Sequence, residues 1–174
     1  MINPWTVLDP SSGAAAVSTE LVARPASFAG LVVGCLDNGK PNTDRFLAQL
    51  FTHLQQEGIR HVVLVRKPNI GRLAPRAMLD ELAERCDVVV TGVGDCAGCC
   101  SCMVQDGIAL ERRGIPTYVV CTSEFHTTAR ISATAAGAPN YPFTVMPHPL
   151  GSLTPELLAE RALAAYRAMR TAPA

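Results

Sequence analysis

The sequence predicts an α/β fold: one three-layer, Rossmann-like or flavodoxin-like domain with a five-stranded, mostly parallel sheet. Three observations predict it. Short apolar runs alternate with amphipathic stretches five times along the chain. The runs are apolar at successive positions, which is typical of parallel strands that helices cover on both faces. The 174 residues suffice for one full hydrophobic core but not for two. Right-handed crossovers then favour the strand order 2-1-3-4-5.

An N-terminal arm is expected at 1–27, and the α/β domain at 28–174. The arm has no sustained hydrophobic period and is rich in proline, so we expect it to lie over the domain or over a partner. The first strand is the run L-V-V-G-C-L at 31–36. The helix at 43–56 follows with apolar residues at helical spacing, and Gly58 ends it.

The remaining elements repeat this alternation. The later strands are short and rich in valine, and are expected at 62–65, 87–92, 117–121 and 143–146. The later helices are expected at 75–86, from the cysteine cluster to about 113, at 126–136 and at 155–169. Gly114 and Gly137 end two of these helices, and Thr154 is the N-cap of the last one.

Composition narrows the classes of function. Lys plus Arg and Asp plus Glu both number 15, so the chain has no net charge to attract nucleic acid or an anionic membrane. No apolar run approaches the roughly 18–20 residues that span a bilayer. The N-terminus does not resemble a secretory signal, so we expect a cytoplasmic location. The weak repulsion between copies allows a homo-oligomer or a hetero-complex with a related subunit.

Four of the seven cysteines lie within seven positions, in the run D-C-A-G-C-C-S-C. Such clustering in a cytosolic chain indicates redox, nucleophilic or metal chemistry rather than a disulfide scaffold. Cys96 follows the third strand where the next helix begins, and a helix N-terminus stabilises a thiolate. Cys99 lies one turn further on and forms a C-x-x-C pair with Cys96, and Cys102 follows after three more residues. We therefore expect Cys96 to be a nucleophile and Cys99 a resolving thiol.

Two other interpretations of the cysteines stay open. Cys96, Cys99 and Cys102 could hold zinc or an iron–sulfur cluster, with Cys35 or Cys121 completing the ligand set, although a zinc site usually gathers two separated pairs. The chain would then be a metal-binding subunit of a larger complex. Alternatively, Cys35 or Cys121 could face Cys96 across a small site, as the two bases of an amino-acid racemase do. In the leading interpretation, no cofactor is expected.

Polar residues follow every expected strand, and the carboxyl ends of parallel strands are where α/β sheets bind ligands. We expect three of these residues to serve catalysis beside the cysteines: Asp95, Glu124 and His148. We expect the others to bind a small-molecule substrate: Asp37, Asn38, Lys40, Lys67, Thr122 and His126.

Four segments in order make the chain resemble a known family. They are L-D-N-G-K-P-N, G-V-G-D-C-A-G-C-C-S-C with E-R-R-G-I-P, V-V-C-T-S-E-F and M-P-H-P-L-G, and they cover roughly residues 30–155. They resemble the UGSC-containing (seleno)proteins, whose members carry selenocysteine or cysteine in a G-D-(U/C)-G-S-C motif. Here Cys96 stands at the selenocysteine position. Ala97 and Gly98 stand where the family name has Gly-Ser.

More distantly, the spacing of Cys96, Cys99 and Cys102 is similar to the U-x-x-C-x-x-C motif of the selenoprotein B component of glycine reductase and of the proline reductase subunit. The resemblance implies attack by Cys96 at an electrophilic centre that bears a leaving group, with Cys99 resolving the product. We therefore expect a cysteine-dependent, reductase-like enzyme that cleaves or substitutes a small molecule and is served by a thiol reductant protein.

Overall fold

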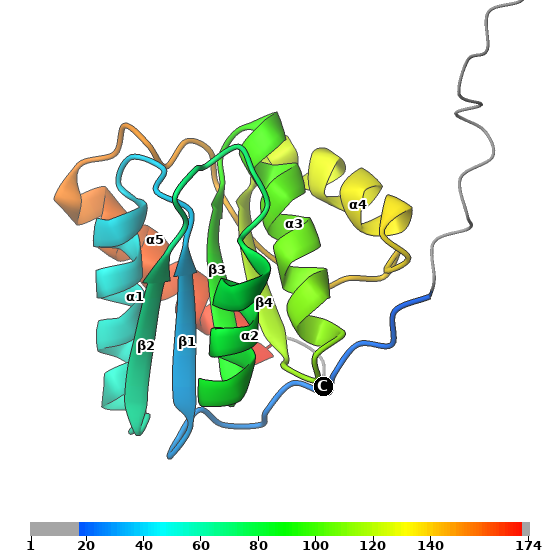
Figure 1. The fold of residues 1–174 in the computed structure, drawn as a ribbon. Coiled ribbons are helices and arrows are strands. Elements are labelled where there is room, and N and C mark those ends of the chain that lie inside the picture. The colour runs from blue at the N-terminus through cyan, green and yellow to red at the C-terminus, as the bar shows by residue number, and fades with distance from the viewer. Residues whose placement is uncertain (1–17, 172–174) are drawn as a thin grey trace, which may run out of the picture.

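Five parallel strands form the central sheet of the computed structural model, which describes residues 18–171 (Figure 1). The strands are β1 (Val32–Asp37), β2 (His61–Arg66), β3 (Val88–Gly94), β4 (Thr117–Thr122) and β5 (Phe143–Met146). Their order is β2-β1-β3-β4-β5, and every neighbouring pair is parallel. The predicted α/β class, three-layer architecture and strand order are confirmed.

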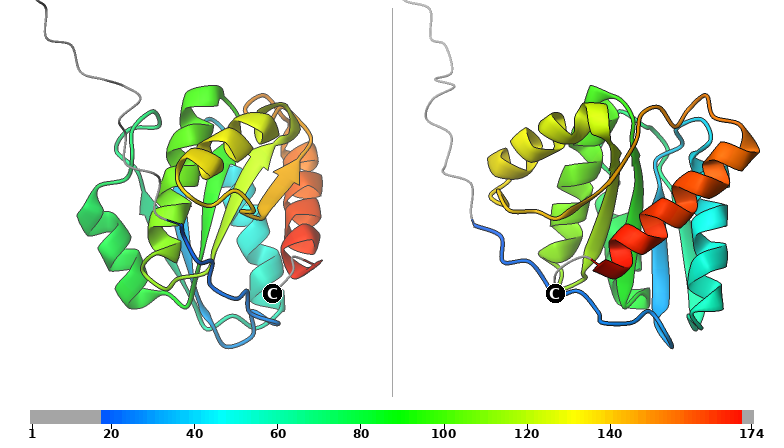
Figure 2. Two further views of the ribbon diagram at one scale, coloured as in Figure 1. Left: turned by 90° about the vertical axis from the view of Figure 1, so that its right-hand side faces the viewer. Right: turned by 180° about the vertical axis from the view of Figure 1, so that it is seen from behind.

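Helices cover both faces of the sheet (Figure 2). They are α1 (Thr43–Gln56), α2 (Arg76–Arg85), α3 (Ala97–Glu111), α4 (His126–Ala135) and α5 (Pro155–Thr171), with a short 3-10 helix, η1 (Ser123–Phe125), before α4. Helices α1 and α5 pack together beneath one face. Helices α2, α3 and α4 lie on the other face, where α3 contacts both of its neighbours.

Buried side chains fill both spaces between sheet and helices. Under α1 and α5 the core includes Phe46, Leu50 and Val90, all fully buried. On the opposite face, one cluster under α3 and α4 includes Met103 and Ile108. A third cluster lies under α2. The central strands β1, β3 and β4 therefore present alternate side chains to cores on the two faces of the sheet.

The third strand is longer than the sequence suggested and runs on through the glycine-rich stretch to Gly94. Strand β1 pairs with it as far as Gly92, opposite Asp37, and β4 pairs with Gly94, opposite Cys121. The register against β4 shifts between Thr91 and Gly94. A Cβ atom added to Gly94 would lie 2.9 Å from Sγ of Cys100, so the absence of a side chain lets α3 begin directly against the strand end.

Strand β2 departs from the expected pattern of strands covered on both faces. Among the described residues, it is an edge strand that pairs only with β1. The Leu64 side chain is 66% exposed, and Val62 is only partly buried. Helix α1 lies beside this strand and leaves a hollow between them, which an edge strand permits because no further strand and helix follow.

The described part of the expected arm, residues 18–27, runs along the α3 side of the domain, and residues 1–17 lie outside the described residues. Arg24 is buried and forms an ion pair with Glu111 at 2.8 Å. Glu111 also accepts a hydrogen bond from the Val22 N–H at 2.8 Å. The Thr19 N–H donates to the carbonyl oxygen of Gly137 at 2.9 Å. These contacts fasten residues 19–24 to the domain.

Candidate active site

The polar residues predicted from the strand ends gather at one edge of the sheet. Asp37 ends β1, Thr122 ends β4, and the loops after β3 and β5 carry Cys96 and His148. Because all five strands are parallel, their carboxyl ends meet there, next to the start of α3 (Figure 1).

Cys96 and Cys99 form a disulfide across the first turn of α3, with their Cα atoms 5.5 Å apart. Cys96 is the N-cap residue and is partly exposed, whereas Cys99 is 1% exposed. The Cys99 Sγ lies 3.2 Å from the carbonyl oxygen of Cys96 and 3.9 Å from that of Val93. The pair is therefore asymmetric, with one sulfur at the surface and one inside.

Asp95 connects the cysteine motif to the loop after β5. Its side chain is 4% exposed. Its two carboxylate oxygens accept hydrogen bonds from the N–H groups of Leu150 at 3.3 Å and Gly151 at 3.2 Å. Nδ1 of His148 lies 2.9 Å from the same carboxylate. Lys40 contributes a distant ion pair at 4.0 Å and donates to the Asp95 carbonyl oxygen at 3.3 Å.

The contacts of His148 determine which ring nitrogen carries a proton when the ring is neutral. Nδ1 lies 2.9 Å from the Asp95 carboxylate and 3.2 Å from Oγ1 of Thr122. The Thr122 hydroxyl donates its own proton to the carbonyl oxygen of Gly94 at 3.3 Å, so Oγ1 is an acceptor towards the ring. Both neighbours are acceptors, which assigns the proton to Nδ1. Nε2 keeps its lone pair, on a ring that is 34% exposed.

Thr122 thus contacts His148 and the end of β3. Ser123 adds a second contact, because its hydroxyl accepts a hydrogen bond from the His148 N–H at 3.3 Å. Phe125 packs edge-on against the imidazole, with ring centroids 5.6 Å apart. Ser123, Leu150 and Gly151 were not among the site residues predicted from the sequence. Leu150 and Gly151 act through backbone N–H groups, which nearly every residue type has, so their residue types do not reveal this contact.

Asp37 and Lys40 also reach this edge. Asp37 is buried, accepts a hydrogen bond from the Gly39 N–H at 2.7 Å and pairs with Arg66 at 3.4 Å. The Lys40 side chain is 20% exposed. Lys40 is the expected substrate-binding residue whose charge is partly accessible beside Asp95.

Asn38 lies inside the protein. Its amide nitrogen donates to the Val93 carbonyl oxygen at 3.0 Å and contacts Sδ of Met103 at 2.8 Å. Its oxygen accepts from the N–H groups of Val93 and Lys40, both at 3.2 Å. The side chain is fully buried and fully bonded within the protein. Asn38 fixes the end of β3 and has no group left for a substrate.

Lys67 has a structural contact as well. Its side chain is fully buried and forms an ion pair with Asp106 of α3, which also accepts the Ala74 N–H at 2.8 Å. Burial raises the pKa of the Asp106 carboxyl, against the lowering effect of the Lys67 and Ala74 hydrogen bonds. Cys102 lies beside this pair, and its partial burial raises the pKa of its thiol. The sequence analysis did not anticipate Asp106.

Cys35 and Cys121, the expected partners of Cys96 in the alternative interpretations, are both fully buried. Cys35 lies in the core under α1 and α5, and Cys121 in the core under α3 and α4. Burial, and then the charge of Asp37, raise the pKa of Cys35. A hydrogen bond with Cys100 raises the pKa of Cys121 and lowers that of Cys100. This geometry gives the two-cysteine interpretation no support.

The two remaining candidates lie at the rim. Glu124 is exposed on η1, and His126 is the partly buried first residue of α4, edge-on to Phe143 at 5.9 Å. Within residues 18–171, no three His, Cys, Asp or Glu side chains are grouped so that they could hold a metal ion. The described residues therefore give the zinc or iron–sulfur alternative no support, and we derive no step through a metal.

Comparison with known proteins shows which family the chain belongs to. The profile of the UGSC family matches residues 6–172. The chain belongs to the UGSC family. The match covers the whole domain and extends into residues 6–17, so it confirms the resemblance drawn from the cysteine motif and its flanking segments. No curated protein matches the sequence. Among the described residues, no helix is long and apolar enough to cross a membrane.

Proposed function

We propose that this UGSC family member is a thiol-dependent enzyme that reductively cleaves a small carbonyl compound bearing a leaving group on the neighbouring carbon. The supporting observation is the disulfide between a partly exposed Cys96 and a buried Cys99 at the start of α3. The accessible sulfur can meet a substrate, and the inner sulfur is placed to resolve the product. The more distant resemblance to the reductase subunits stays a prediction from motif spacing.

The reaction begins from the reduced pair. The Cys96 thiolate attacks the substituted carbon, a carbon–sulfur bond forms, and the leaving group departs with the electron pair of its bond. The N-cap position favours the thiolate, because the first N–H groups of α3 carry the positive end of the helix dipole.

The second step consumes the Cys99 thiol. Its sulfur attacks the Cys96 sulfur, the disulfide forms, and the carbon–sulfur bond breaks. The electron pair passes to the substrate carbon, where the neighbouring carbonyl group stabilises it before it takes up a proton. In sum, two thiols and the substituted compound give the disulfide, the unsubstituted compound and the protonated leaving group. A dithiol reductant then returns the pair to its reduced form.

His148 is the residue we assign to proton transfer, acting through Nε2. Asp95 and Thr122 are positioning residues, since both accept from Nδ1 and thereby keep the lone pair on Nε2. Because Asp95 directly precedes Cys96, the histidine is tied by its partner to the backbone beside the nucleophile. Lys40 is the group we assign to attracting the polar end of the substrate.

A phenacyl halide tests the complete sequence, since it combines a carbonyl group with a neighbouring leaving group. Reduced protein, freed of reductant, should release one equivalent of acetophenone for each Cys96–Cys99 disulfide formed. The Cys99→Ser variant should instead retain the phenacyl group as a thioether on Cys96, as peptide mass spectrometry would show. Cys102→Ser is the matched control, because it removes a thiol of the same motif, and it should behave as the native protein does.

Two results would overturn the proposal. One is a stable phenacyl thioether on Cys96 of the native protein, with the Cys99 thiol still free. The other is equal labelling of Cys96 and Cys102 in the reduced protein, which would mean that Cys96 is not a favoured nucleophile.

A further inference from the structure

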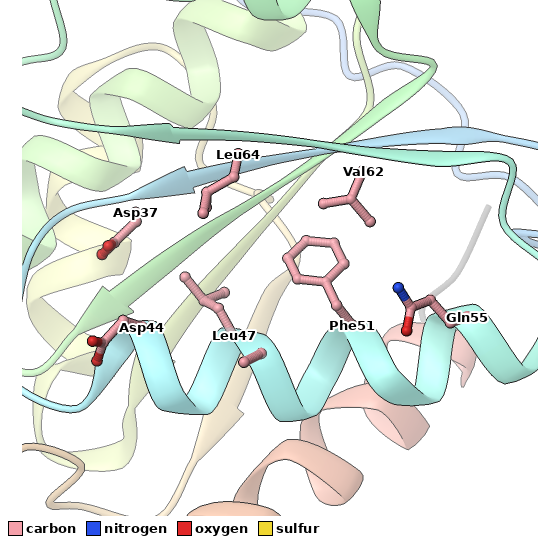
Figure 3. A pocket seen from close by; sticks show the side chains of 8 residues that line it. Asp37, Asp44, Leu47, Phe51, Gln55, Val62 and Leu64 are labelled. Atoms are coloured by element: carbon pink, nitrogen blue, oxygen red, sulfur yellow. The ribbon is translucent and has the colours of Figure 1, made fainter.

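An apolar groove lies between α1 and the edge strand β2 (Figure 3). It has a volume of about 320 Å³. Leu47 and Phe51 of α1 lie on one side of it, and Val62 and Leu64 of β2 on the other. Its ends are polar, with Asp37 and Asp44 at one end and Gln55 at the other (Figure 3). An apolar hollow with a polar rim is typical of a surface that another segment of polypeptide covers.

The edge of β2 offers hydrogen bonds as well as apolar contacts. Within residues 18–171, β2 pairs with β1 alone, so its outer N–H and carbonyl groups have no strand beside them. Such an edge accepts an extended segment, whose backbone pairs with the strand and whose alternate side chains enter neighbouring pockets.

The chain itself contains a segment of that chemistry outside the described residues. The sequence P-W-T-V-L-D-P occupies positions 4–10. Trp5, Thr6 and Val7 are residue types that favour strands, and the flanking prolines limit a strand to the stretch between them. In an extended conformation Trp5 and Val7 share one face, which is the spacing that two adjacent apolar pockets require. The family match starts at residue 6, so most of this stretch belongs to the region that the family shares.

The length of the chain between this segment and Thr19 limits which groove the segment can reach, that of its own domain or that of another copy. Thr19 is fixed to Gly137, at the end of α4, and the described chain starts on the side of the domain opposite β2 and α1 (Figures 1 and 2). The roughly eleven residues from Leu8 to Thr19 span at most about 40 Å when fully extended. A domain of about 150 residues has a radius of gyration near 15 Å, so the path halfway round its surface is roughly 60 Å. The segment is therefore too short to reach the groove of its own domain.

We propose that residues 5–8 of one copy dock in the α1–β2 groove of a second copy, and that two copies exchange these segments in a symmetric dimer. Each copy then contributes one segment and one groove, as a closed two-fold arrangement requires. The absence of net charge means that the two copies approach without long-range repulsion. The proposal is independent of the chemistry assigned to Cys96.

Trp5 is the only tryptophan of the chain, so its fluorescence reports directly on the segment. The full-length protein should show blue-shifted emission at high concentration. On dilution the emission should move to the red over the concentration range in which sedimentation velocity shows the dimer dissociating. Trp5→Ala should give a monomer at concentrations where the native protein is dimeric.

Leu64→Glu tests the groove from the other side. Leu64 is 66% exposed, so the folded monomer tolerates the change, which circular dichroism can verify. Placing a charge in the docking surface should weaken dimerisation roughly tenfold or more. Ile131→Glu is the matched control, because Ile131 is also 66% exposed but lies on α4, and it should leave the dimer unchanged.

Each contrary outcome is distinct. Emission typical of water-exposed tryptophan at all concentrations would show that the segment does not dock. Blue-shifted emission in a monomer would mean docking within one copy. A dimer that Leu64→Glu does not weaken would place the interface elsewhere. Any of these would overturn the proposal.

Discussion

The Nδ1 atom of His148 lies 2.9 Å from the carboxylate of Asp95, the residue that directly precedes Cys96 in the chain. This contact joins the loop after β5 to the start of α3. The same carboxylate accepts two backbone N–H groups of that loop, from Leu150 and Gly151. One side chain thus holds the loop in place and orients the imidazole.

Asp95→Asn should weaken both effects. An amide cannot accept from His148 and both N–H groups as the carboxylate does, so we expect a loss of about 1–3 kcal/mol in the free energy of unfolding. Acetophenone release from the phenacyl probe should slow at least tenfold. Urea unfolding and product analysis measure the two effects. Glu160→Gln, at an exposed position of α5, is the control and should change neither. Unaltered release by Asp95→Asn would exclude a positioning role.

Reduced protein should be alkylated by iodoacetamide first at Cys96. Partial burial raises the pKa of Cys86 to about 11, so at pH 8 only about one Cys86 thiol in a thousand is ionised. Cys35 and Cys121 are fully buried with raised pKa values and should label only on unfolding. Peptide mass spectrometry across a pH series gives the order. Labelling of Cys86 ahead of Cys96 would contradict the structure.

Lys67→Met should destabilise the protein by about 3–5 kcal/mol, because it leaves the Asp106 carboxylate buried without its cation. The double variant with Asp106→Leu should recover much of that loss, since no charge then remains buried. Denaturant titration measures both. Arg76→Met is the control: Arg76 is 88% exposed, and its pair with the exposed Asp80 should contribute no more than about 1 kcal/mol. Equal losses in Lys67→Met and Arg76→Met would refute the distinction.

Gly107→Ala should destabilise the domain by about 1–3 kcal/mol through overpacking. The added Cβ would lie 2.5 Å from Cγ2 of Val119 and 3.1 Å from the Tyr141 hydroxyl, so α3 would have to move away from β4. Gly98→Ala, in the same helix, meets no atom within 4 Å and should be neutral or slightly stabilising. Thermal melting of the two variants makes the comparison, and matched melting temperatures would show that α3 does not pack this closely.

Glu57→Gln should lower stability at neutral pH by about 0.5–1 kcal/mol. Partial burial raises the pKa of Glu57, but hydrogen bonds from the Phe28 N–H, Tyr166 and Ser27, together with Arg170, lower it overall. A lowered folded-state pKa contributes stability above the unfolded-state pKa and loses it as the pH falls through the folded value. The difference between native and variant should therefore be full at pH 7 and shrink below about pH 4.5. If the stability difference between native protein and Glu57→Gln persists at pH 2, the charge of Glu57 is not its cause, and the change in side-chain shape is.

The fold was predictable because its signals are local. Each short apolar run predicts a strand, and apolar residues spaced three or four positions apart predict each helix. The preference for right-handed crossovers between parallel strands then leaves one favoured strand order. The last two residues of β3, Val93 and Gly94, were not predictable, since G-V-G has weak strand propensity and Gly94 is held by its pairing with Cys121 of β4.

The candidate site was predictable only in outline. Parallel strands bring their carboxyl ends together, so polar loop residues such as Asp95 and His148 could be expected to meet. Whether a polar side chain faces substrate or the interior depends on partners distant in sequence. Asn38 is saturated by Val93 and Met103, and Lys67 is neutralised by Asp106, which no local pattern indicates.

The difference in exposure between Cys96 and Cys99 has a directional consequence for recycling. A reducing thiol that approaches the oxidised pair from solvent can reach only the Cys96 sulfur, since Cys99 is 1% exposed. The mixed disulfide with the reductant must then form on Cys96, and Cys99 departs as the leaving thiolate. The residue that would receive the substrate is therefore also the point of electron entry. Substrate would react at the reduced Cys96 and reductant at the oxidised pair, so the two act on the same sulfur in alternation.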